Sequence, residues 1–339
     1  MKSLPLTLLL LSLWLPIQSE AVTFKIASIA PDGTSWMKQM RKGAKEVKQR
    51  TNGRVKFRFY PGGIMGNDKS VLRKIRIGQL HGGALTGGGL SDIYPDSQIY
   101  SLPFVFRNLQ EVDYVRGKME SQLIKGIDQS GFVSFGISGG GFAYMMSKEP
   151  VHSINDLLKS KVWMPEGDNV NRAAFSSFNI TPISLPLPDV LTGLQTGLID
   201  TVAASTVGAI ALQWHSRVKY LNNTPLLYLY GTMVVKKSKF KKLSVSDQAI
   251  VREVMNNVFA KLNTQNRKDN LAAMEALKNQ GIEIIDSPTE TINRWRTGSA
   301  QAMDKLSQEG VFSPAILTTL RKHLSTYRNG KDVAQSGTH

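Results

Sequence analysis

The stretch Lys161-Val162-Trp163-Met164-Pro165-Glu166-Gly167-Asp168 lies near the middle of the chain. Its first half predicts a short buried strand, with two apolar residues at alternate positions and a proline where the strand must end. Its second half is typical of a turn, because it carries a glycine and two carboxylates. A tryptophan at the end of a buried strand, beside an acidic turn, lies where open α/β sheets hold ligands. The stretch therefore indicates an α/β fold and a candidate binding residue, Trp163.

Strands and helices alternate on both sides of this stretch. The predicted strands cover residues 24–29, 55–59, 82–86, 132–137, 143–147, 161–164, 198–203 and 226–235. The predicted helices cover residues 35–50, 68–77, 109–129, 170–178, 187–197, 290–308 and 314–327. One further helix, from Val245 to Gln280, is unusually long and has apolar residues at helical spacing. The alternation predicts an α/β protein whose chain crosses between two lobes more than once.

The N-terminal residues predict export. Lys2 precedes an apolar run, residues 4–16, that is too short to span a bilayer, and Ser19-Glu20-Ala21 has small residues where a signal peptidase requires them. We expect residues 1–21 to be a signal peptide, with cleavage after Ser19 as the alternative. The chain has no cysteine, which excludes disulfides, thiolate zinc sites, a cysteine nucleophile and a lipid-modified N-terminal cysteine. These features predict a soluble periplasmic protein.

The chain is strongly basic, with 42 Lys and Arg, 26 Asp and Glu and a formal net charge of +16. Nucleic acid is the first partner that such a charge suggests. However, the basic residues are scattered, for example around the predicted helix between Lys38 and Arg50, without an aromatic-interleaved patch or a basic tail. The charge therefore predicts solvated faces, only transient contact with a membrane surface and no nucleic-acid partner.

The motifs that carry chemistry argue against catalysis. The glycine triplets Gly87–Gly89 and Gly139–Gly141 lack the GxGxxG order and a following lysine–serine pair, so they predict close approach of the backbone to packed chain or to a ligand. The five histidines show no metal-ligand spacing. Glu166 and Asp168 are too close in sequence to form a glycosidase pair. We expect no catalytic residues, no metal site and no cofactor.

An exported, two-lobed α/β chain without catalytic groups is typical of a solute-binding protein. From Phe24 to about Gln280 the sequence resembles the substrate-binding subunits of tripartite ATP-independent periplasmic (TRAP) transporters, the DctP family. The resemblance rests on four segments in the family's order and spacing. They are Tyr60-Pro61-Gly62-Gly63-Ile64-Met65-Gly66, Leu102-Pro103-Phe104-Val105-Phe106-Arg107, Ile154-Asn155-Asp156-Leu157 leading into residues 161–165, and Leu194-Gln195-Thr196-Gly197-Leu198-Ile199-Asp200.

The resemblance implies a two-lobed periplasmic binding protein-like fold with hinge strands and a long bracing helix. The implied division places residues 22–142 mainly in lobe 1 and residues 143–235 mainly in lobe 2, with a crossover back near residues 226–235. The bracing helix covers residues 245–280, the C-terminal helices cover residues 281–329, and residues 330–339 form a disordered tail. The resemblance also implies capture of a small organic solute by hinge closure and its delivery to the small and large membrane permease subunits, with transport driven by an ion gradient.

Three positions depart from the family's pattern. In the family, the strand that contains Trp163 normally ends in an arginine that grips a substrate carboxylate. The stretch Gly141-Phe142-Ala143-Tyr144 lacks a second cation that is common in the family, and Ala203-Ala204-Ser205 replaces an acidic–Asn-Pro ending. An organic acid is the family's usual solute, whereas aromatic side chains favour stacking on a flat ligand or cation–π contact with an amine.

Eight residues are the predicted ligand contacts: Trp163, Phe142, Tyr144, Asp32, Thr86, Glu166, Asp168 and Ser205. Trp163 is expected to contact the solute because its position faces the cleft by resemblance, and the alternative is a core residue. Two other functions remain open. One is a periplasmic ligand-sensing or accessory protein on the same fold. The other, less favoured, is an enzyme, which would need a titratable pair converging in the cleft.

Overall fold

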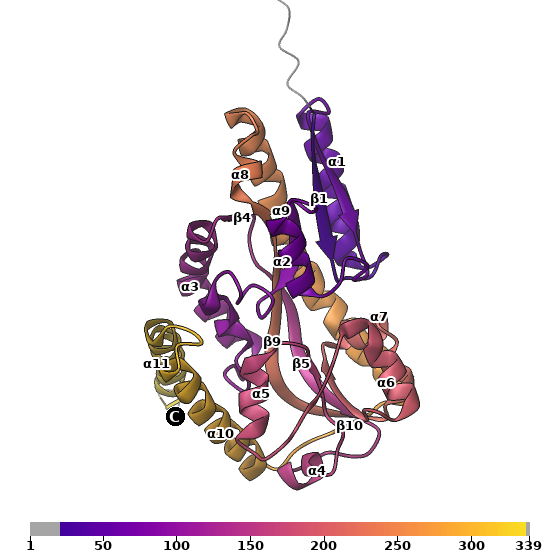
Figure 1. The fold of residues 1–339 in the computed structure, drawn as a ribbon. Coiled ribbons are helices and arrows are strands. Elements are labelled where there is room, and N and C mark those ends of the chain that lie inside the picture. The colour runs from indigo at the N-terminus through magenta and orange to yellow at the C-terminus, as the bar shows by residue number, and fades with distance from the viewer. Residues whose placement is uncertain (1–20, 337–339) are drawn as a thin grey trace, which may run out of the picture.

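The computed structural model describes residues 21–336, with side chains as far as residue 330. The predicted signal peptide lies, apart from Ala21, outside the described residues. Two α/β lobes are joined by two long strands and braced by one long helix (Figure 1), which confirms the predicted fold class. No helix in residues 21–336 has the length and apolar character that a bilayer span requires.

Lobe 1 is built on a parallel three-stranded sheet in the order β2-β1-β3. Its elements are β1 (Val22–Ser28), α1 (Ser35–Arg50), β2 (Val55–Tyr60), α2 (Asp68–Arg76), β3 (Gly82–Thr86), β4 (Phe132–Ser134) and α8 (Lys237–Phe240). Helix α1 begins where it does because the Thr34 hydroxyl accepts a hydrogen bond from the backbone N–H of Met37. Phe24 and Ile26 of β1 are fully buried in the core of the lobe.

The hinge consists of β5 (Ser138–Ser147) and β9 (Tyr220–Lys236), which run through both lobes. The C-terminal half of β9 pairs with β3 and β4 of lobe 1, and its N-terminal half pairs with β5 and with β10 (Glu283–Ile285). Strand β9 begins six residues before the predicted start, Leu226. The two lobes therefore share one sheet, and bending of β5 and β9 is the available closing motion.

Lobe 2 contains the second half of β5 and the small parallel sheet β6-β7. Its elements are α4 (Ile154–Leu158), β6 (Trp163–Pro165), α5 (Asn169–Ser176), β7 (Ile183–Leu185), the 3-10 helix η2 (Leu187–Asp189), α6 (Val190–Thr196), β8 (Thr201–Ala204), α7 (Thr206–Ala211) and the 3-10 helix η3 (Trp214–Arg217). Helix α4 starts with a capping box, in which the side chains of Ser153 and Asp156 bond to each other's backbone N–H.

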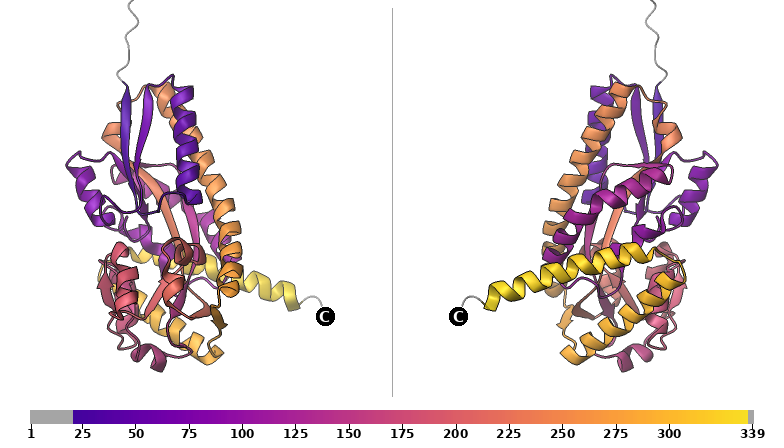
Figure 2. Two further views of the ribbon diagram at one scale, coloured as in Figure 1. Left: turned by 90° about the vertical axis from the view of Figure 1, so that its right-hand side faces the viewer. Right: turned by 90° about the vertical axis from the view of Figure 1, so that its left-hand side faces the viewer.

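The predicted long helix is α9 (Val245–Asn279), which packs on α1 of lobe 1, on β5 and on α7 of lobe 2. Figure 2 shows it running along the edge of both lobes. Three more helices and a 3-10 segment complete the chain: η1 (Pro95–Ser101), α3 (Leu109–Gln129), α10 (Thr289–Gln308) and α11 (Pro314–Ser336). Helix α11 extends past Tyr327, so residues 330–336, predicted as a disordered tail, continue the helix, whereas residues 337–339 lie outside the described residues.

Candidate functional site

Away from the strands that they share, the lobes meet where the N-terminus of α2 faces the turn after β6. Asn67 Nδ2 donates to Glu166 Oε2 at 3.1 Å, while Asn67 Oδ1 caps α2 by accepting the backbone N–H of Ser70 at 3.0 Å. A Cβ added at Gly63 would lie 3.7 Å from Pro188 of lobe 2. These positions define two facing edges of the lobes, called the lips below: residues 61–69 of lobe 1 and residues 165–168 with 186–189 of lobe 2.

Of the carboxylates on these lips, Asp68 and Asp168 each lie at a helix N-terminus and are hydrogen-bonded there. Asp68 Oδ2 accepts hydrogen bonds from the Thr86 hydroxyl at 2.7 Å and from the Thr86 N–H at 3.2 Å. Its Oδ1 is buried and has no hydrogen-bond partner among the described residues. Asp168 caps α5 and accepts from the Asn171 backbone at 3.0 Å and from its side-chain amide at 2.7 Å. Burial raises the pKa of both Asp68 and Asp168, which favours the neutral carboxyl and gives each lip a group that can donate as well as accept a hydrogen bond.

The three aromatic residues predicted to contact the solute differ in burial. Trp163 lies in the core of lobe 2. It is 5% exposed, its ring packs edge-to-face on Trp214 at 5.1 Å between centroids, and its Nε1 donates to the Leu185 carbonyl at 3.1 Å. The structure therefore favours the core alternative for this residue. Phe142 is likewise buried, with its ring edge-to-face on Tyr228 at 5.6 Å.

Tyr144 differs from these two rings. It is half-buried on β5 opposite Ala204, and it packs against both the core of lobe 2 and the core under α3. Burial raises the pKa of its phenol, so the hydroxyl stays protonated and can donate a hydrogen bond. Of the three predicted aromatic contacts, only Tyr144 keeps a partly exposed ring.

All five polar predictions have hydrogen-bond partners within the protein. Asp32 is exposed and pairs with Arg41 of α1 at 2.9 Å, and the hydrogen bond from Arg41 lowers the pKa of the Asp32 carboxyl. Ser205 caps α7 by accepting the Gly208 N–H at 3.2 Å. Thr86 holds Asp68. Glu166 and Asp168 lie together on the lip of lobe 2, Thr86 reaches the lip of lobe 1 through Asp68, and Trp163 and Phe142 are buried.

The first glycine triplet is explained by close packing. A Cβ at Gly87 would lie 2.4 Å from the Tyr230 ring, and one at Gly89 would lie 1.9 Å from Asp68 Oδ2. The second triplet, at the start of β5, is the docking point of α9. A Cβ at Gly139 would lie 1.7 Å from the Tyr228 hydroxyl. Packed chain, the first of the two predicted explanations, therefore accounts for both triplets.

An asparagine ladder on α9 binds the backbone of the second triplet. Asn263 Oδ1 accepts the Gly139 N–H at 2.8 Å, Asn266 Nδ2 donates to the Gly139 carbonyl at 2.8 Å, and Asn270 Nδ2 donates to the Gly140 carbonyl at 3.0 Å. The asparagines are three and four residues apart, so they lie on one face of the helix. Sequence reasoning missed this ladder, although three amides at that spacing in an otherwise apolar stripe are a usable signal.

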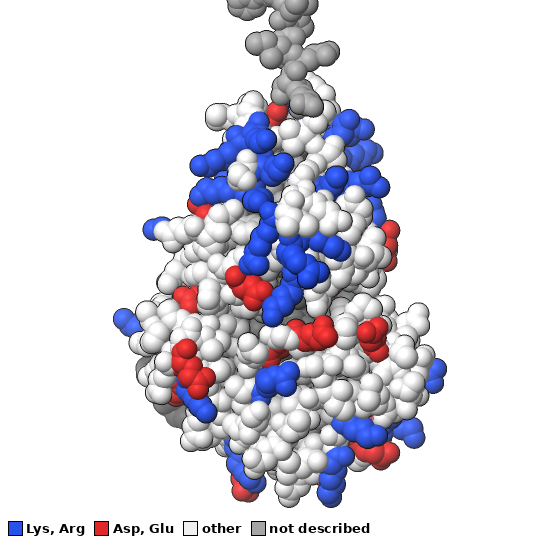
Figure 3. Space-filling model, viewed as in Figure 1, with Lys and Arg blue, Asp and Glu red and all other residues white. Residues whose placement is uncertain are grey.

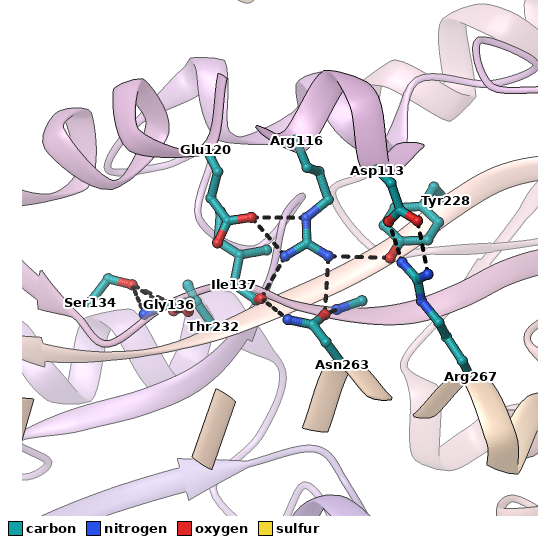
Figure 4. Close-up of polar contacts among 11 residues, drawn as sticks. Asp113, Arg116, Glu120, Ser134, Gly136, Ile137, Tyr228, Thr232, Asn263 and Arg267 are labelled. Carbon is teal, nitrogen blue, oxygen red and sulfur yellow. Dashed lines mark hydrogen bonds and ion pairs between the residues drawn. The ribbon is translucent and has the colours of Figure 1, made fainter. Parts of the chain in front are cut away.

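Arg116 of α3 completes the hinge from the opposite side (Figure 4). It is 7% exposed, and its guanidinium donates to the Ile137 carbonyl at 2.7 Å, to Asn263 Oδ1 at 3.0 Å and to Glu120 Oε2 at 2.7 Å. Asn263 Nδ2 donates to the same Ile137 carbonyl at 2.9 Å. Helices α3 and α9 therefore clamp the strand where it passes from one lobe to the other.

Comparison with known proteins gives a consistent result. A family model described as bacterial extracellular solute-binding protein, family 7, matches residues 26–309. A solute-binding protein of Verminephrobacter eiseniae is 26% identical over 281 residues, which cover 82% of each chain. The fold is shared with DctP7 of Bordetella pertussis, an extracytoplasmic solute receptor solved with pyroglutamic acid (TM-score 0.82, 18% identity, 90% and 100% of the two chains). It is also shared with a TRAP periplasmic solute-binding protein of Pseudomonas putida solved with D-glucuronate (TM-score 0.80, 22% identity, 88% and 96%).

Proposed function

Because this chain belongs to the bacterial extracellular solute-binding proteins of family 7, the DctP family of TRAP transporter subunits, we propose that it captures a small organic acid between its lobes in the periplasm. The captured solute passes to the small and large membrane permease subunits. This is a binding function without covalent chemistry, as in the rest of the family.

The hinge is the observation that carries the proposal. Strands β5 and β9 pass through both lobes, and α3 and α9 clamp them at Ile137 and Gly139. Because the clamp fixes the crossing point, rotation of one lobe against the other is confined to the strands beside it. Closure brings Asn67 to Glu166, and a solute bound by both lips stabilises that closed form by its differential affinity for it.

The solute class follows from the relatives and from the lips of the cleft. The receptors with this fold described above hold pyroglutamic acid and D-glucuronate, which are both carboxylates. In this chain the position of the family's arginine is Trp163, whose indole N–H already bonds to Leu185. We therefore propose that another cation of lobe 2 meets the carboxylate. Arg172 of α5 is the candidate, because it is exposed beside the β6-β7 sheet, where it donates to Ser184 Oγ at 2.9 Å, and has no ion pair among the described residues.

A thermal-shift screen against small carboxylic acids, amino acids, amines and neutral sugars tests the proposal. An organic acid at a hundredfold excess over its dissociation constant should stabilise the protein by about 2.7 kcal/mol. Arg172→Gln should weaken that ligand by tenfold or more, whereas Arg217→Gln, an exposed and unpaired residue of the same lobe, should leave it unchanged. Stabilisation by amines alone would overturn the organic-acid class. A ligand that binds without lobe closure in small-angle scattering would overturn the capture mechanism.

The ligand-sensing alternative shares the binding step and differs in the partner. Reconstitution with the membrane permease subunits distinguishes the two functions, because only a transport subunit supports uptake of the identified solute into vesicles.

A further inference from the structure

The charge of this protein is concentrated at one end. Residues 22–79 and 236–255, called the basic pole below, carry 20 Lys or Arg and 5 Asp or Glu. They therefore account for +15 of the chain's net charge of +16. The remaining residues are close to neutral, although they make up most of the chain. The scattering inferred from the sequence does not hold in three dimensions.

The basic pole is one continuous region of lobe 1. It comprises β1, α1, β2, α2, α8 and the first turns of α9. Arg50 of α1 pairs with Glu253 of α9 at 2.8 Å, and Arg54 pairs with Asp247 at 2.8 Å. Lys236 Nζ, at the end of β9, donates to the Arg76 carbonyl of α2 at 3.3 Å. Figure 3 shows the Lys and Arg side chains covering much of the upper lobe, with Asp and Glu gathered lower down.

The five carboxylates of the basic pole all form ion pairs or hydrogen bonds with other side chains. Four of them, Asp32, Glu46, Asp247 and Glu253, form ion pairs with Arg41, Arg50 or Arg54. Asp68 is bonded to Thr86. One more cation, Lys237, pairs with Asp128 of α3. Among the described residues the other 16 cations have no ion pair, so most of the positive charge of the pole faces outward without a counter-charge.

The composition of this surface favours a lipid partner over a protein partner. Stable protein interfaces have an apolar core from which charged residues are depleted. Here the exposed large apolar residues are single: Ile64 is 69% exposed before α2, Ile77 is 73% exposed next to Arg76, and Val245 is 85% exposed close after Lys242. Isolated apolar side chains among Lys and Arg match the interface of a bilayer, where the cations meet headgroup phosphates and the apolar side chains enter between headgroups.

We propose that the basic pole is a docking surface for anionic phospholipid, and that it holds the protein reversibly on the membrane by the outer end of lobe 1. The attraction comes from many weak charge contacts, so binding is fast, salt-sensitive and independent of headgroup shape. Docking by this surface confines diffusion of the loaded protein to the plane in which a membrane partner lies. The inference goes beyond solute capture and does not depend on which solute fills the cleft.

Vesicle co-sedimentation of the exported chain tests the proposal. The protein should bind vesicles of phosphatidylcholine mixed with phosphatidylglycerol, bind phosphatidylcholine alone far less, and dissociate as the ionic strength rises past about 0.15 M. The test variant neutralises four exposed cations of the pole without an ion pair: Arg73→Gln, Arg76→Gln, Lys241→Gln and Lys242→Gln. The control variant removes the same charge elsewhere: Lys159→Gln, Arg217→Gln, Lys219→Gln and Lys322→Gln.

Each Lys or Arg near an anionic surface strengthens binding roughly fivefold, so the pole variant should lose roughly a hundredfold or more in vesicle affinity. The control variant should keep most of its affinity. Equal loss in the two variants, or binding that ignores phosphatidylglycerol, overturns the proposal. So does binding confined to vesicles that contain the permease, which would assign the surface to a protein partner. The solute-induced thermal shift should be the same in the pole variant and the parent chain, so a failure of membrane binding is distinguishable from a failure of solute capture.

Discussion

Replacing Trp163 by alanine tests whether the strand β6 carries a solute contact or a piece of core. The side chain is 5% exposed, fills the space against Trp214 and donates its N–H to Leu185. Truncation of a buried tryptophan costs about 3–5 kcal/mol, because it leaves a cavity as well as removing apolar contacts. The Leu185 carbonyl also loses its donor. We therefore expect Trp163→Ala to destabilise the fold by about 4 kcal/mol.

The corresponding change in melting temperature follows from the size of the protein. An unfolding entropy of about 2.1 cal/mol/K per residue, over roughly 310 residues, is about 0.65 kcal/mol/K. A loss of about 4 kcal/mol then lowers Tm by about 6 °C. Leu198→Ala is the matched control in the same lobe, because Leu198 is 50% exposed and should change Tm by less than about 1 °C.

Calorimetry or fluorescence melting measures both variants, with and without the solute identified by screening. At equal saturation the solute should raise Tm of Trp163→Ala by the same amount as in the parent chain. Trp163→Phe, which keeps a ring against Trp214 and loses only the N–H, should cost about 1–3 kcal/mol. If Trp163→Ala melts with the parent chain and its solute shift disappears, then Trp163 is a solute contact and the core assignment is wrong.

Two further substitutions test the closing contact and the hinge. Asn67→Asp keeps the cap of α2 but sets a carboxylate against Glu166, so it should weaken solute binding several-fold and increase the radius of gyration in small-angle scattering. Adding Glu166→Gln restores a donor and should recover binding, whereas no recovery would show that the lips do not meet in solution. Arg116→Met leaves the Ile137 carbonyl and Asn263 short of a buried donor and should cost about 3–5 kcal/mol in denaturant unfolding, against less than about 1 kcal/mol for Arg267→Met, whose ion pair with Asp113 is more exposed. Equal costs for the two arginine variants would contradict the hinge clamp.

The sequence predicts the regular elements well where one periodicity runs without interruption. Helix α9 matches its prediction within one residue, because apolar residues recur at helical spacing and Ser244 caps the start. Strand β9 is longer than predicted, since Asn222-Asn223-Thr224-Pro225 resembles a loop. The pairing of its first residues with β5 and β10 makes them a strand, and that pairing comes from parts of the chain about 60 to 80 residues away.

The site was harder to predict for the same reason. The position of Trp163 on a buried strand was correct, but its role depends on Trp214, which lies 51 positions later in a 3-10 helix. The glycine triplets correctly predicted close approach of the backbone, and no local pattern could name Tyr230 or the asparagines of α9 as what approaches. Asn67, which joins the lobes, looks in sequence like an ordinary helix cap.

Trp163 is therefore part of the core of lobe 2, and changing it changes that core. An arginine placed there would bury a guanidinium against the Trp214 ring, and the described contacts offer it no carboxylate partner. Burial of an unpaired charge costs several kcal/mol, so this position could not hold a cation without rebuilding of the core of lobe 2. We infer that specificity lies instead on the lips, where Glu166 and Asp168 lie beside Asn67. Those side chains bring no positive charge, so the cations available to a carboxylate here are Lys69 on the lip of lobe 1 and Arg172 of α5.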